Sequence, residues 1–255
     1  VFDGLLNACL LCKGETIDAE KINEYLVNNG ILTANVRADS NQSDAWRDYQ
    51  QILSEFGLIY STRLSKVLTL TPIAMAYLNK SLSYSELITL QLLRYQYPNG
   101  HKSQLSPSLM QSYGENFNYE SFTELQAHYN IQLRPAALIW KILYKLWESG
   151  EQPILSLDEM QGYAVRCTVM SDYSPCTESI IDSRHDGRQL QPLTRARRNM
   201  ADWMKLLSQT LLFNVSGDGN TIALSTYSIN ERKAVDYVCS RLSNPDSFWK
   251  YKEDN

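Results

Sequence analysis

The chain has 255 residues, of which 44% are hydrophobic and 20% charged, and its formal net charge is −4. These proportions are typical of a globular protein and exclude a disordered one, while the length allows one large domain or two to three small ones. No run approaches 18 uncharged apolar residues, which excludes a membrane-spanning helix, and the negative charge taken alone argues against a nucleic-acid partner.

The first 80 residues predict helices followed by a β-hairpin. Apolar residues recur at helical spacing, and glycines or capping residues mark the helix ends. Two β-prone runs then flank a polar tip that carries Arg63 and Lys66. The expected elements are helices over 2–11, 16–29, 44–56 and 71–78, and strands over 58–60 and 67–70. Three helices followed by a hairpin with a basic tip is the order of a winged helix.

A similar order returns after Pro135. An amphipathic helix is expected up to Gly150, and Ser156 with Glu159 forms a capping box that opens a second helix. The remaining expected elements are helices over 195–211 and 228–242, strands over 212–215 and 221–224 around an Asp-Gly turn, and a long loop over 167–194.

Between these two modules, the pattern predicts a helix over 83–95 and a polar linker over 104–130 with one short helix near 120–129. The expected fold is mainly α with small β-hairpins. It has two winged-helix subdomains, residues 1–80 and 133–255, joined by a connecting helix and linker over residues 81–132.

Charge is unevenly distributed along the chain. Residues 61–110 carry a net +4 and residues 181–213 a net +3, whereas residues 1–60 and 111–180 each carry −5. A local basic face matters more for nucleic-acid binding than the overall charge does. The same alternation also fits an ordinary solvated surface.

The five cysteines are odd in number and three have Leu, Val or Ala neighbours, which predicts reduced, mostly buried thiols and a cytoplasmic protein. Cys9 and Cys12 form a C-x-x-C, and Cys167 and Cys176 could make a second pair. Zinc is not expected, because the spacing of Cys9 and Cys12 simply places both on one face of an apolar helix. Cys167 and Cys176 are nine positions apart, which is too wide for the usual pair of zinc ligands. The three histidines are scattered and give no support to a catalytic triad.

Several short segments resemble AlwI-like type IIS restriction and nicking endonucleases over nearly the whole chain. The matching segments are Trp46–Tyr49–Leu53–Gly57–Leu58, Leu70-Thr71-Pro72, Gln91–Asn99, Leu133-Arg134-Pro135, Leu157-Asp158-Glu159, Arg197–Met200, Ser243-Asn244-Pro245 and Phe248-Trp249. The resemblance implies that this region is the DNA-recognition half of such an enzyme, built of winged-helix subdomains. A Mg²⁺-dependent nuclease domain or subunit would then follow it.

No complete nuclease site is expected within the 255 residues. The candidates for one are Asp218, Glu231 and Lys233, but a predicted turn and a helix start do not bring carboxylates together as adjacent strands do. We therefore expect no catalytic residue and no cofactor in this chain, with Mg²⁺ required only by an attached nuclease domain. The N-terminus, Val1-Phe2-Asp3, resembles no signal peptide, and the missing initiator Met indicates a fragment or processed chain.

The third helix of each module is the candidate DNA reader, because a winged helix places that helix in the major groove. Arg and Asn side chains suit base edges and phosphates. The candidate DNA-binding residues are Arg195, Arg197, Arg198, Asn199, Lys205, Arg63, Lys66, Asn41, Gln42, Arg47, Arg94 and Lys102. Tyr95 and Tyr97 are expected to pack, and the core is expected to hold Trp46, Trp140, Trp147 and Trp203.

These observations favour a double-stranded DNA-recognition fragment from a restriction or defence enzyme. The alternative is a winged-helix scaffold that binds proteins within a larger complex, a role that the mild acidity suits. No membrane partner is expected.

Overall fold

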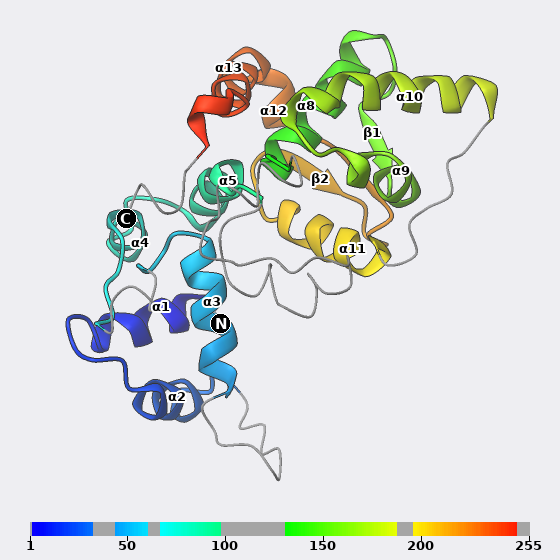
Figure 1. Ribbon diagram of the computed structural model, residues 1–255. Coiled ribbons are helices and arrows are strands. Elements are labelled where there is room, and N and C mark those ends of the chain that lie inside the picture. The colour runs from blue at the N-terminus through cyan, green and yellow to red at the C-terminus, as the bar shows by residue number, and fades with distance from the viewer. Residues whose placement is uncertain (1, 33–43, 61–66, 98–130, 188–195, 249–255) are drawn as a thin grey trace, which may run out of the picture. The chain divides into compact units, whose positions relative to one another are not determined.

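The computed structural model describes residues 2–32, 44–60, 67–97, 131–187 and 196–248, with the backbone alone at 44–45, 47–48 and 196–199. Helices dominate these residues, as the sequence predicts, and the named strands form one small three-stranded antiparallel sheet (Figure 1). The chain divides into two compact units, Val1–Leu87 and Ile88–Asn255, and the division falls within helix α5 (Tyr84–Arg94). Within the described ranges, no helix is long and apolar enough to cross a membrane.

Unit 1 consists of the start of α5 and of α1 (Phe2–Leu11), α2 (Ala19–Asn28), α3 (Asp44–Glu55) and α4 (Pro72–Leu78). Local capping explains the helix boundaries. The Asp18 carboxylate accepts hydrogen bonds from two backbone N–H groups at the start of α2, and Thr71 caps α4 ahead of Pro72. Gly57 follows the end of α3 and has a φ of 62°, the left-handed conformation that glycine favours after a helix.

Isolated bridges stand where the first hairpin is expected. Ile59 pairs with Leu70, and Thr16, which precedes α2, pairs with Val67. The surrounding helices enclose one apolar core that includes Leu6, Cys9, Ile22, Leu26, Trp46, Leu53, Leu58, Leu68 and Ala74. Trp46 is therefore a core residue, as predicted.

The elements of unit 2 after α5 are, in chain order, α8 (Pro135–Glu148), β1 (Ile154–Ser156), α9 (Leu157–Gly162), α10 (Tyr173–Asp186), α11 (Ala196–Leu207), β2 (Phe213–Val215), β3 (Thr221–Leu224), α12 (Thr226–Asn230) and α13 (Arg232–Leu242). Helix α8 lies at the centre, and most of its residues are buried. The indole N–H of Trp140 donates to Ser228 Oγ at 3.1 Å, and Ser228 Oγ donates to the Leu212 carbonyl at 2.8 Å. These two bonds join α8, α12 and the start of the hairpin.

The sheet has the order β1-β3-β2, with both pairs antiparallel. Ile222 of β3 is fully buried and lies opposite Leu155 on one side and Val215 on the other. At the end of β1, Ser156 forms the expected capping box with Glu159, so the chain passes directly from strand into α9. Strand β1 was not expected from the sequence.

Three expectations for unit 2 are wrong. The segment 167–194 is not simply a loop, because residues 173–186 form α10, which packs alongside α8 (Figure 1). The helix expected over 228–242 is two helices, α12 capped by Ser225 and α13, with the break at Glu231. Trp147 is 39% exposed rather than buried, and the Arg232 guanidinium lies 5.1 Å from the centre of its ring.

Candidate nucleic-acid interface

Helix α11 is held against the body of unit 2 along one face. It packs on α9 and on β2, with Met204 and Leu207 buried. Lys205 and Leu206, on the other side of the helix, are exposed. The outward face of the helix is therefore open to solvent. The helix begins at Ala196 and ends at Leu207, four residues earlier than expected.

The basic start of this helix is only partly described. Arg197, Arg198 and Asn199 lie in the first turn of α11, where the backbone alone is described, and Arg195 lies outside the described residues. Lys205 is exposed and its Nζ lies 3.6 Å from Asp202 Oδ1. The structure thus places Arg197, Arg198, Asn199 and Lys205 on a single helix.

The carboxyl end of α5 adjoins α11. Tyr95 makes an edge-to-face contact with Trp203, with ring centres 5.5 Å apart, and Thr89 Oγ1 accepts a hydrogen bond from the Leu211 N–H. Tyr95 is therefore a packing residue, as predicted. Arg94, the neighbour of Tyr95, is exposed in the last turn of α5, so the fold brings this candidate beside α11 although the two are far apart in sequence.

The remaining candidates belong to other parts of the chain. Arg47 lies on α3 of unit 1, where only its backbone is described. Outside the described residues lie Asn41, Gln42, Arg63, Lys66 and Lys102.

A second arginine near α5 was missed by the sequence reasoning. Arg134 is 2% exposed, and its guanidinium donates to the Leu242 and Ser247 carbonyls at 2.8 and 2.7 Å and stacks on Phe248. Burial, together with the positive charge of Arg94, lowers its pKa to about 10. The described residues offer Arg134 carbonyl and hydroxyl acceptors but no carboxylate partner. The sequence shows an arginine before Pro135 but gives no indication that its side chain is buried.

The turn between β2 and β3 is organised by Asp218. Its carboxylate accepts hydrogen bonds from Ser216 Oγ at 2.5 Å and from the Asn220 backbone and side-chain N–H groups at 3.1 and 2.9 Å. These bonds lower the pKa of Asp218 to about 2, with the Ser216 bond as the largest cause. The sequence of this turn, 216–220, contains no basic residue. The tip of the second hairpin is therefore acidic.

The other two nuclease candidates lie on separate elements from Asp218. Glu231 occupies the exposed break between α12 and α13, and Lys233 is exposed in the first turn of α13. Among the described residues, no group of three or more His, Cys, Asp or Glu side chains is placed to hold a metal ion.

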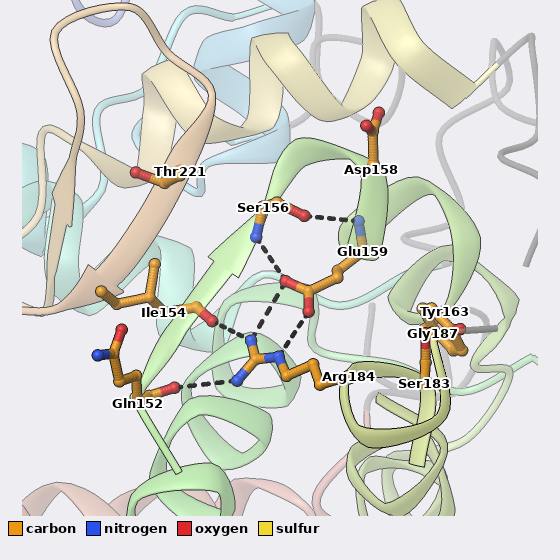
Figure 2. Close-up of a pocket in the computed structure, with 10 residues that line it drawn as sticks. All are labelled: Gln152, Ile154, Ser156, Asp158, Glu159, Tyr163, Ser183, Arg184, Gly187 and Thr221. Carbon is orange, nitrogen blue, oxygen red and sulfur yellow. Dashed lines mark hydrogen bonds and ion pairs between the residues drawn. The ribbon is translucent and has the colours of Figure 1, made fainter. Parts of the chain in front are cut away.

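A cavity of about 550 Å³ lies between β1, α9, the end of α10 and the start of β3 (Figure 2). Its centre is an ion pair between Arg184 and Glu159. Arg184 Nε donates to Glu159 Oε1 at 2.7 Å and Nη2 to Oε2 at 3.2 Å. The same guanidinium donates to the carbonyls of Gln152 and Ile154 at 3.3 and 2.5 Å.

These contacts leave little of the Arg184 charge for a ligand. Glu159 also accepts a hydrogen bond from the Ser156 N–H at 2.8 Å. The same carboxylate therefore caps α9 and, through Arg184, holds α10 against α9. Figure 2 shows Asp158 pointing away from this pair, and Asp158 is exposed. The arrangement positions α10 against β1 and α9, and the chain leaves it through Gly187 towards α11. The sequence reasoning missed Arg184 because it missed α10.

Comparison with known proteins finds no protein-family model that matches this chain and no similar curated protein.

Proposed function

We propose that this chain recognises double-stranded DNA, with α11 of unit 2 as the principal reading helix. The observation that carries the proposal is that α11 packs on unit 2 through one face only. Met204 and Leu207 fix one face on α9 and β2, while the first turn holds Arg197, Arg198 and Asn199. A helix held in this way by its inner face can enter the major groove with its N-terminal residues at the base edges.

The order of elements in unit 2 supports a winged helix. Helix α8, strand β1, helices α9 and α11 and the β2–β3 hairpin follow one another, with α10 inserted between α9 and α11. Strand β1 pairs with β3, so the sheet order β1-β3-β2 places the first strand beside the last. This is the arrangement in which a hairpin closes against the helix bundle.

Unit 1 has the same order in outline, and we propose that it is a second winged helix. Thr16, between α1 and α2, takes the place of the first strand by bridging to Val67, and the Ile59–Leu70 bridge follows α3. The basic tip of its hairpin, with Arg63 and Lys66, is proposed to contact phosphates. Unit 1 would thus add affinity while unit 2 supplies most of the base contacts.

Local charge supports DNA as the partner. The end of α5 beside α11 carries Arg94, and the buried Arg134, which precedes α8, adds its positive charge to that of Arg94. Together with the Arg-rich start of α11, this gives unit 2 a basic region within a chain of net charge −4. On the resemblance described above, the protein is the recognition part of a restriction or defence enzyme whose Mg²⁺-dependent nuclease is a separate domain or subunit.

The test is binding of the full chain to a fluorescent random duplex, measured by anisotropy at 50 and 200 mM salt. With four phosphate contacts the affinity is expected to fall about 100-fold between these salt concentrations, because bound counterions are released. Arg197→Ala with Arg198→Ala is expected to weaken binding by about 30-fold or more. The charge-matched control is Lys13→Ala with Arg241→Ala, two exposed residues of which one lies in the turn after α1 and the other in the last turn of α13.

Wild-type protein that shows no binding at 50 mM salt would refute DNA recognition. Equal loss in the double variant and its charge-matched control would refute α11 as the reading helix.

A protein-interaction scaffold is the second candidate, favoured by the exposed apolar side chains of α12 and α13. Tyr237 is 66% exposed, and Tyr227, Ile229 and Val238 are exposed as well. A scaffold predicts no DNA binding together with saturable capture of one partner that Tyr237→Ser prevents.

A further inference from the structure

Two cysteines meet at the start of α10. Cys167 follows a short 3₁₀ turn, Ala164–Arg166, and Cys176 lies in the first turn of α10. Cys167 and Cys176 line the same small depression, and Cys167 Sγ lies 3.9 Å from the Asp172 carbonyl. The fold therefore brings together two thiols that are nine residues apart in the sequence.

The connecting loop is held in shape without help from the sulfur atoms. The Asp172 carboxylate accepts the N–H groups of Thr168 and Val169 at 2.7 and 3.0 Å. The Thr168 carbonyl accepts the Gln132 N–H at 2.7 Å, which ties the loop to the strand-like segment before α8. These bonds fix the backbone of the loop that connects the two cysteines.

Both thiols can be reached by small molecules. Cys167 and Cys176 are 7% and 8% exposed, and both line an open depression of about 200 Å³ together with Pro175 and Ser179. By contrast, Cys9 and Cys239 are completely buried. The hydrogen bond to Cys167 and burial raise the pKa of the Cys176 thiol, so an oxidant in excess is needed at neutral pH.

We propose that Cys167 and Cys176 form a dithiol modification site, which small thiol oxidants convert to an intramolecular disulfide and thiol reductants restore. With a diazene oxidant such as diamide, one sulfur adds to the N=N bond and the second sulfur then displaces the nitrogen. An S–S bond forms, the S–N bond breaks, and the two thiol protons end on the two nitrogens of the hydrazine product. This site is independent of the proposed DNA binding.

Oxidation would covalently close the loop that carries the chain from α9 into α10. Closure of a loop of this length restricts the unfolded chain, and the expected rise in the Tm of the oxidised protein is about 5–10 °C. The inserted helix α10 would then be fixed at its start by the disulfide and at its end by the Arg184–Glu159 pair.

The test uses the full chain, treated with excess diamide under native conditions, then blocked with iodoacetamide and digested with trypsin. Residues 167–184 form one tryptic peptide, so the disulfide lowers its mass by two hydrogens and prevents both alkylations. Residues 1–13 form another and hold Cys9 and Cys12, which provides an internal control for the buried pair. The expected result is oxidation of peptide 167–184, with peptide 1–13 alkylated only after unfolding.

Recovery of peptide 167–184 with both cysteines alkylated after oxidant treatment would overturn the proposal. So would equal oxidation of peptide 1–13, since the oxidant would then be acting on unfolded chain. Cys167→Ser is expected to leave Cys176 open to alkylation and to abolish the Tm rise. If oxidised Cys167→Ser protein still gains the same stability, the disulfide is not its cause.

Discussion

Arg184→Gln should loosen α10 from the rest of unit 2. Arg184 lies in the last turn of α10 and makes two hydrogen bonds to the Glu159 carboxylate and two to backbone carbonyls, one ahead of β1 and one in its first residue. The substitution removes the charge and the planar, forked set of donors but keeps an amide of similar length. Glu159 keeps its bond to the Ser156 N–H, so the cap of α9 is not removed directly.

The expected loss of stability follows from exposure. A buried charge-assisted hydrogen bond is worth about 1.5–3 kcal/mol, but the Arg184 and Glu159 side chains are 24% and 19% exposed, so we count about 1 kcal/mol for each of these two bonds. The two carbonyl bonds add about 0.5 kcal/mol each, because water can replace the arginine there. The total is about 3 kcal/mol, or roughly 5–10 °C in Tm for a unit of this size.

Two matched variants sharpen the experiment. Arg184→Lys keeps the charge but not the fork, and about half the loss is expected. His185→Gln removes the neighbouring contact to Glu151, and since His185 is 65% exposed the change should be under about 0.5 kcal/mol. Thermal unfolding gives the totals, and hydrogen exchange of residues 173–186 against 232–242 shows whether α10 opens locally. A change within 0.5 kcal/mol for Arg184→Gln, with unaltered exchange in α10, would refute the reasoning.

Three further changes test other parts of the structure. Trp140→Phe removes the donor to Ser228 from a fully buried site and should cost about 2 kcal/mol in urea unfolding, whereas Trp147→Phe at the surface should cost under about 0.5 kcal/mol. Gly4→Ala places a Cβ 2.5–2.8 Å from three side-chain atoms of Ile31, so a loss of about 1–3 kcal/mol is expected, with recovery in the double variant Gly4→Ala, Ile31→Ala. Asp218 has a folded pKa of about 2, below its unfolded value of 3.8, so its stabilising effect is present above about pH 4 and is lost as the pH falls towards 2. Wild-type protein should therefore lose stability relative to Asp218→Asn over that range in acid titrations of unfolding, and parallel curves would contradict the assignment.

The predictable parts of the fold are those with strong local causes. Helix α8 has an apolar pattern and an N-terminal Pro, α9 has its capping box, and the β2–β3 hairpin has an Asp-Gly turn. In each case residues within one turn specify the boundary. Sequence reasoning therefore located these elements to within a few residues.

The missed elements depend on contacts far along the chain. Helix α10 is rich in Ser and Asp and has little apolar periodicity. It is held by the ion pairs Lys145–Glu178 and Arg184–Glu159 and by the buried Ile180 side chain. Strand β1 has three residues and exists because β3 pairs with it. Neither feature has a signal within its own segment.

For the candidate interface, the sequence predicted the basic helix start, and the structure adds which surface accompanies it. Asp218 makes the β2–β3 turn acidic, so phosphates are disfavoured there. Arg94, in contrast, lies next to the Tyr95–Trp203 contact with α11, and Arg134 behind it has no carboxylate partner among the residues described. If unit 2 binds DNA as proposed, the backbone contacts that orient α11 should therefore come from the end of α5 rather than from the hairpin.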